Sequence, residues 1–243
     1  MFFRPLILVG LALLLPIEGF AQGDAYMLKR VLQRYTEAYG GFRDVEALSS
    51  LSVEGEIEQN GQTFDFLMRK KRPYSLRYRL SNEWNRVICG YNGTDGWLRV
   101  ETNGAVTIET LDPDAAKALR ELARFDSPLF RALEKSENEI SLVEQVIFDE
   151  HSAYVLAVSE SGRARCHYYI DAVTAHVLRI DELDDAGEIQ FQTLYRDYKE
   201  VEGYPFAHEV ETRLKGETLT LAKVNVIEVN PGLLSFYFEM PKH

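Results

Sequence analysis

Long stretches of this chain alternate between hydrophobic and polar residues, which is the pattern of strands that bury one face. From Leu51 to Glu58 the odd positions are apolar or glycine, and the even positions are serine or glutamate. The alternation resumes after Asn60-Gly61, a pair that favours a tight hairpin turn. Roughly a dozen such segments follow at hairpin spacing. This favours one large antiparallel sheet, curled into a barrel or half-barrel, over a βαβ fold.

Three segments instead repeat apolar residues every three or four positions, which predicts amphipathic helices. The first begins at Asp24 and is stopped by Gly40-Gly41. The other two lie within residues 112–135, where Asp112-Pro113 and Ser127-Pro128 are helix-start pairs. Because helices bury their apolar stripe on a sheet, we predict that these two cover an apolar concavity. The alternative is an ordinary packed core with no room for a ligand.

The N-terminal segment has the pattern of a secretory signal peptide. Arg4 precedes an apolar run over residues 5–16, and Gly19 and Ala21 are the small residues expected before a cleavage point. The run is too short for an ordinary membrane span, and no cysteine lies at the cleavage site to carry a lipid anchor. We expect residues 1–21 to be removed and residues 22–243 to form a single soluble, exported domain.

The formal net charge of the chain is -11. This charge makes nucleic acid a poor partner and would repel the protein from anionic lipid surfaces. Cys89 and Cys166 lie on separate predicted strands and form no Cys-x-x-Cys motif. In an oxidising compartment they would pair if those strands were close, and two buried free thiols are the alternative.

Residue patterns typical of catalysis or metal binding are missing from the sequence. Its five histidines show neither His-x-x-x-His nor Glu-x-x-His spacing. Cys166 and His167 are neighbours on a predicted strand, so their side chains point to opposite faces and cannot pair. The chain has no Gly-x-Ser-x-Gly elbow and no phosphate loop. We therefore expect no enzyme activity, no metal and no cofactor; an uncharacterised hydrolase would need a polar site that the sequence does not reveal.

Several short motifs follow one another in a familiar order. They are Lys71-Arg72-Pro73, Tyr91-Asn92-Gly93 with Trp97, Tyr169-Ile170-Asp171 with Leu178-Arg179, residues 197–208, and residues 229–231 with 238–241. In order and spacing the chain resembles the periplasmic outer-membrane lipoprotein-sorting (LolA-like) superfamily over nearly its whole mature length. It departs from the family pattern at Asn92, where aspartate is usual, and at Ala175, where a turn glycine is common.

The resemblance implies a mainly β (α+β) fold: an unclosed antiparallel β-barrel or half-barrel, with an N-terminal helix and two short helices covering the concave face. It further implies a soluble periplasmic carrier, expected as a monomer, that holds a lipid or lipoprotein acyl chain. Such a carrier would exchange its cargo with a membrane-bound donor and acceptor protein. The alternative is a non-catalytic periplasmic sensor of the same fold that binds a regulatory membrane protein.

A carrier needs a continuous apolar wall, because each methylene removed from water is worth about 0.8 kcal/mol. The alternative is that the same side chains fill each other's space. The residues that we expect to form this hydrophobic cavity are Phe64, Phe66, Met68, Leu76, Tyr78, Trp97, Leu119, Leu122, Phe125 and Phe130.

A basic run over residues 69–72, followed by Arg77 and Arg79, is a local exception in this acidic chain. Arg72, Arg77 and Arg79 are candidates for contacting phosphate head groups or an acidic partner surface. The alternative is a charged strand edge, which protects a sheet against aggregation.

Overall fold

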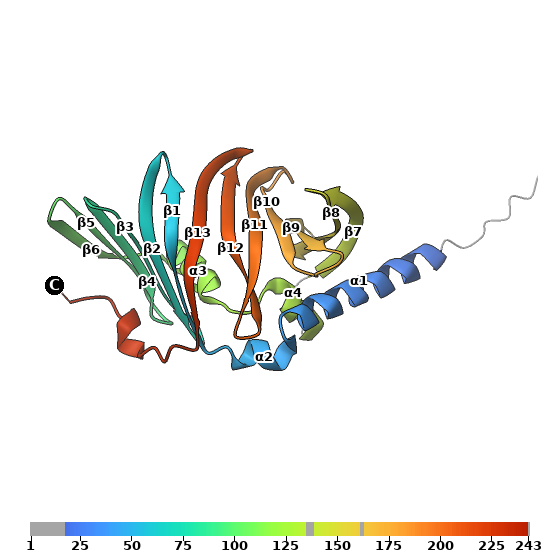
Figure 1. Ribbon diagram of the computed structural model, residues 1–243, viewed down its shortest axis with the longest axis horizontal. Helices are drawn as coiled ribbons and strands as arrows, with labels where there is room; N and C mark the ends of the chain where they lie inside the picture. Colours follow the sequence, from blue (N-terminus) through green and yellow to red (C-terminus); the bar gives the residue numbers. More distant parts are fainter. Residues whose placement is uncertain (1–17, 135–138, 161–162, 243) are drawn as a thin grey trace, which may run out of the picture.

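The computed structural model describes residues 18–134, 139–160 and 163–242. Within these residues, thirteen antiparallel strands form one continuous sheet in the order β6-β5-β4-β3-β2-β1-β13-β12-β11-β10-β9-β8-β7. The edge strands β6 and β7 do not pair with each other, so the curved sheet stays open. Figure 1 shows this curved sheet with its two edge strands far apart. The large antiparallel sheet predicted from hairpin spacing is confirmed, and so is the unclosed half-barrel that the family resemblance implied.

The chain builds the sheet as two arms that meet where β1 pairs with β13. The first arm consists of β1 (Ser50–Gln59), β2 (Gln62–Lys71), β3 (Ser75–Ser81), β4 (Asn85–Tyr91), β5 (Gly96–Thr102) and β6 (Ala105–Thr110). The second arm consists of β7 (Glu139–Phe148), β8 (His151–Glu160), β9 (Arg163–Asp171), β10 (Val177–Leu183), β11 (Ile189–Val201), β12 (Tyr204–Leu214) and β13 (Glu217–Val229).

Local turn chemistry explains the hairpins that connect these strands. Asn60 and Gly61 have φ angles of 50° and 72°, and Asn103 and Gly104 have φ angles of 50° and 83°. Two consecutive residues with positive φ make the type I′ turn, whose twist matches that of the strands it connects. These turns therefore set the registers β1–β2 and β5–β6.

Helices precede, interrupt and follow the run of strands. They are α1 (Glu18–Ala38), α2 (Gly41–Ala47), α3 (Pro113–Ala123), α4 (Pro128–Glu134) and the 3-10 helix η1 (Ser235–Phe238). The Asp112 carboxylate accepts hydrogen bonds of 3.0 and 2.9 Å from the backbone N–H groups of Asp114 and Ala115, which confirms the predicted start of α3. Ser127 caps α4 by accepting from the N–H of Phe130 at 3.4 Å.

The N-terminal helix differs from its prediction in one respect. It ends before Gly40-Gly41 as predicted, but it begins at Glu18 and so includes the expected cleavage point after Ala21. The apolar run over residues 5–16 lies outside the described residues. Gly40 and Gly41 both have positive φ angles and lead into α2, a helix that the sequence pattern did not predict. Among the described residues, no helix combines the length and apolarity needed to cross a membrane.

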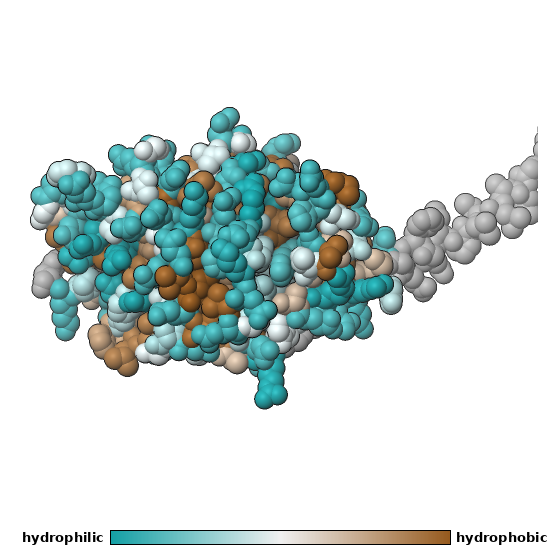
Figure 2. All heavy atoms as spheres, viewed as in Figure 1, coloured by the Kyte–Doolittle hydropathy of each residue, from teal (hydrophilic) through white to brown (hydrophobic). Residues whose placement is uncertain are grey.

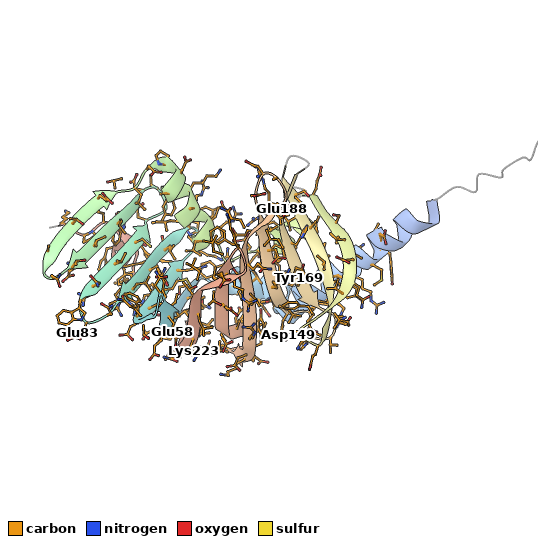
Figure 3. All side chains as sticks on the ribbon, turned by 90° about the horizontal axis from the view of Figure 1, so that it is seen from above. Glu58, Glu83, Asp149, Tyr169, Glu188 and Lys223 are labelled. Carbon is orange, nitrogen blue, oxygen red and sulfur yellow. The ribbon has the colours of Figure 1, made fainter. Side chains whose placement is uncertain are left out.

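Three helices pack on the same face of the sheet, which we call the inner face. On the second arm, Leu32 of α1 and Leu129 of α4 share a core with Leu156 of β8. On the first arm, Ala123 of α3 is buried against Leu76 of β3. Seen from above, α3 lies on one side of the sheet, and Glu58 and Lys223 lie together on the other, outer side (Figure 3). Figure 2 shows the outer face as largely hydrophilic, with a hydrophobic patch over part of the sheet.

Candidate functional site

A cavity of about 170 Å³ lies on the inner face, between the cores of the two arms. Helices α1, α2 and α4 surround it together with the loop between α3 and α4 and the start of β12. Its lining is mostly aromatic and aliphatic, as in sites that hold apolar ligands. The lining residues are Tyr35, Tyr39, Val45, Leu48, Leu51, Lys70, Arg124, Phe125, Ser127, Phe130, Tyr204, Pro205 and Phe206.

Two tyrosine hydroxyls fix the helices around this cavity. Tyr35 of α1 shares a 2.9 Å hydrogen bond with the Ser127 hydroxyl at the start of α4. Tyr204 of β12 donates a 2.7 Å hydrogen bond to the carbonyl oxygen of Asp44 in α2. Burial raises the pKa of Tyr35 far above its ordinary value, so this phenol stays neutral. These two hydrogen bonds therefore join neutral groups.

Two cationic side chains also line the cavity. Lys70 faces inward because it lies two residues after Met68 and four after Phe66 on β2, and so shares their face of the sheet. Its Nζ donates to the Arg124 carbonyl oxygen at 3.4 Å. Burial lowers the pKa of Lys70 to about 8. The Nε of Arg124 is buried and has no hydrogen-bond partner among the described residues. Sequence reasoning named Lys70 only as part of the basic run over residues 69–72, and it did not select Arg124 for the site. The alternation of β2 already placed Lys70 on the same face as the inner apolar side chains.

The predicted cavity residues divide into separate groups in the structure. Phe125 and Phe130 line the cavity. Leu122 is 48% exposed on α3, so it forms no part of the wall. Phe64 shares the inner face of β2 but is not in the cavity lining. The remaining inner-face residues pack in the cores beside the cavity: Phe66, Met68, Leu76, Tyr78 and Leu119.

Trp97 lies on the outer face, opposite to the expected cavity. Trp97 pairs with Gly90, and Gly90 pairs with Arg77, so these three positions share one face of the sheet. Arg77 follows Leu76, which points inward, so the shared face is the outer one. The indole ring occupies space over Gly90, where an added Cβ would come within 2.4 Å of the ring. The expectation failed because η1 covers this part of the outer face and buries an aromatic side chain there.

The three arginines proposed to contact a partner are placed differently from one another. Arg72 donates 2.8 Å hydrogen bonds to the carbonyl oxygens of Leu48 and Val45, so it holds the end of α2 against β2. Arg77 donates to the Tyr237 carbonyl oxygen at 2.7 Å and lies over the Trp97 ring. These contacts give both residues a structural role.

Arg79 belongs to an outer arginine cluster, made of Arg69, Arg77, Arg79 and Arg99. Burial lowers the pKa of Arg77, and the positive charges of the other three members lower it further. The Oε2 atom of Glu101 lies 3.4 Å from the Nη2 atom of Arg99. The Nε atoms of Arg79 and Arg99 are buried without a hydrogen-bond partner among the described residues. Among the described residues, the cluster thus carries more positive charge than its ion pair with Glu101 neutralises.

The two cysteines are free thiols. Cys89 is on β4 and Cys166 is on β9, and the strand order places seven strands between these two. The disulfide considered from the sequence is therefore not formed, because the two strands belong to different arms. Burial raises the pKa of Cys166 to about 11, which keeps this thiol protonated and unreactive.

A second cavity, of about 340 Å³, opens beside the turns that follow β7 and β9. His151 Nδ1 lies 2.7 Å from Asp171 Oδ2 at its rim. The other carboxylate oxygen of Asp171 accepts from the N–H groups of Val173 and Thr174, so this residue organises a turn. In the part of the chain that the structure describes, no three His, Cys, Asp or Glu side chains are grouped to hold a metal ion.

Comparison with known proteins gives matches at the level of structure alone. The sequence matches no protein-family model and no curated protein. A DUF1329 family protein from Desulfovibrio piger superposes with a TM-score of 0.60 at 12% identity, covering 87% of this chain and 97% of that chain. A LolA superfamily protein from Nitrosomonas europaea superposes with a TM-score of 0.56 at 12% identity, with the same coverage of 87% and 97%.

A proposed outer membrane lipoprotein-sorting protein domain from Vibrio parahaemolyticus superposes with a TM-score of 0.50 at 14% identity, covering 90% of this chain and 97% of that chain. Each of the three alignments covers 97% of the matched chain. Superposition over most of each chain shows a shared fold. Identities this low leave the ligand open. The chain has a LolA-like fold.

Proposed function

We propose that this protein is a soluble periplasmic carrier that shields an acyl chain of a lipid or lipoprotein on the inner face of its open sheet. The observation that carries the proposal is the apolar cavity between the sheet and its helices, which Phe125 and Phe130 line. The LolA-like fold supports it, since a similar structure is described as an outer membrane lipoprotein-sorting protein domain. We further infer that the protein acts as a monomer, meets a membrane-bound donor and acceptor, and makes or breaks no covalent bond.

The present cavity is too small for a complete long acyl chain. Its volume of about 170 Å³ lies below the roughly 300 Å³ at which ligand pockets usually begin. Entry therefore requires the α3–α4 segment to move outward, as lids do in other proteins. Such a movement breaks the Tyr35–Ser127 hydrogen bond and takes the buried side chains of Leu129 and Phe130 out of the second-arm core. Burial of a chain of a dozen carbons, on the order of 10 kcal/mol, would offset the contacts that the lid gives up.

Uptake of an uncharged fluorescent alkyl probe tests the carrier function. Val45→Phe adds a ring to a buried residue of the cavity wall and should reduce probe uptake. Val106→Phe adds the same ring at an exposed position on β6 and should leave uptake unchanged. Purified protein that yields no lipid in native mass spectrometry and takes up no probe would contradict the proposal.

A second candidate function is a protein-binding sensor, and the outer arginine cluster favours it. Four guanidinium groups with few counter-charges fit an acidic protein surface. A photo-cross-linker at Arg86, beside the cluster on β4, should then capture one acidic membrane protein whether or not lipid is present. Arg79→Glu should abolish this capture, and Lys199→Glu on β11 should not. Equal capture by both variants would argue against the sensor.

A further inference from the structure

We propose that the inner-face cavity receives a single-chain amphiphile with an anionic head, and that Lys70 and Arg124 bind this head. The inference rests on the proposed carrier function, because it specifies the ligand class of the same cavity. It predicts a carboxylate or phosphate head in preference to the uncharged ester of a neutral lipid.

The charges in the cavity wall have one sign. Among the described residues that line it, the charged side chains are Lys70 and Arg124, and both are cations. The rest of the lining is apolar or neutral, with the hydroxyls of Tyr35 and Ser127 already bonded to each other. An apolar wall with two cations on it has the pattern of a site for an amphiphile with a negatively charged head.

Both cations have unused hydrogen-bond donors. A lysine ammonium has three donors, and that of Lys70 makes one long bond of 3.4 Å, to a neutral carbonyl oxygen. The Nε–H of Arg124 is buried and makes none within the described part of the chain. An anionic head between these groups would accept charge-assisted hydrogen bonds, which are the strong class.

The carboxylates near Arg124 do not neutralise the pair. Glu121 lies 3.7 Å and Asp126 lies 3.5 Å from the Arg124 guanidinium, both longer than good charge-assisted bonds. Asp126 is also shared with Arg72 at 3.7 Å and Arg131 at 3.5 Å. One carboxylate thus faces three arginines, and within the described part of the chain no carboxylate pairs with the ammonium of Lys70. Burying such a charge is unfavourable unless a ligand compensates it.

Competition among three amphiphiles with the same alkyl chain tests the inference. Dodecanoic acid, dodecyl phosphate and dodecanol would each displace the uncharged alkyl probe from the full mature chain. At least one anion should compete about tenfold better than the alcohol, and the better of the two anions identifies the head. Lys70→Met should reduce this ratio to near one. Lys71→Met is the matched control, because the adjacent Lys71 points to the other face and donates to Ser235; it should keep the ratio.

The outcomes separate this inference from the carrier function. Equal binding of alcohol and anions by the unaltered protein would overturn the inference and leave the carrier function standing. A preference for anions that Lys70→Met retains would also overturn it. Failure of all three amphiphiles to displace the probe would overturn both proposals. The ratio of anion to alcohol competition in the unaltered protein tests the preference for an anionic head even if the Lys70 variant does not fold.

Discussion

The indole Nε1 of Trp97 donates a 2.9 Å hydrogen bond to the carbonyl oxygen of Phe238, which ties β5 to η1 near the end of the chain. Trp97 is 1% exposed, and Phe238 is fully buried. The outer face of the first arm is therefore closed by the C-terminal segment, and a second, smaller apolar layer forms there. This layer anchors β3–β5, on whose inner face α3 packs.

Replacing Trp97 tests that anchor. Trp97→Phe removes the indole donor and leaves the buried carbonyl oxygen of Phe238 unpaired. It also replaces the indole with a smaller ring. We therefore expect the free energy of unfolding to fall by about 1–3 kcal/mol. Urea denaturation monitored by circular dichroism measures this loss. Trp84→Phe is the matched control, since Trp84 is 64% exposed and should tolerate the change. Similar losses for the two variants would contradict the role of the bond.

Acid should weaken the protein through Glu211. This carboxylate accepts hydrogen bonds from Arg213 at 2.6 and 3.0 Å, from Thr218 at 2.7 Å and from Arg196 at 3.0 Å. The bonds from Arg213 are the largest cause that lowers its pKa, from 4.5 to about 2. A lowered folded-state pKa gives stability that is complete above pH 4.5 and lost as the pH falls towards 2.

Glu211→Gln should therefore lower the free energy of unfolding by about 2–3 kcal/mol at neutral pH. The difference from the unaltered protein should shrink as the pH falls below 4.5. Denaturant titrations at a series of pH values measure it. Glu209→Gln, at a more exposed position two residues earlier, should cost less. A loss that does not vary with pH would contradict this explanation.

Lys70 should destabilise the empty protein. Its pKa is lowered from 10.5 to about 8, so the unfolded chain binds more protons between these values and stability rises with pH across this window. Below pH 8 the penalty is complete. Lys70→Met should accordingly raise the free energy of unfolding by about 1–3 kcal/mol at neutral pH, and less at high pH. Thermal denaturation without ligand measures the gain, and Lys71→Met should not show it.

A buried ion pair on the second arm should be essential for folding. Asp181 is fully buried, and its carboxylate contacts Arg179 and accepts from Gln192 at 3.0 Å. Asp181→Ala leaves the Arg179 guanidinium without that partner, so we expect a loss of about 3–5 kcal/mol. Asp185→Ala, which removes a largely exposed carboxylate beyond the end of the same strand, should cost about 0–1 kcal/mol. Chemical denaturation of the two variants provides the comparison.

Local features of the sequence predicted the elements and their class of fold. The period of two along β1 and β2, the Asn60-Gly61 turn and the Asp112 cap each depend on residues that are close in the chain. Consecutive hairpins build neighbouring antiparallel strands, so a large antiparallel sheet followed from their spacing. Its unclosed form was implied by the family resemblance. The same local signals placed Phe125 and Phe130 on the segment that covers the inner face.

The tertiary structure alone decided which face of a strand receives the helices and which distant groups meet. Trp97 lies outside because the β4–β5 register places it over Gly90 and η1 covers that face. Arg72 donates hydrogen bonds at the end of α2, a helix that no periodic pattern predicted. Lys70 and Arg124 line one cavity because α3 ends above β2. Side-chain alternation assigns residues to two faces of one strand, but only packing between distant segments determines which face encloses the cavity.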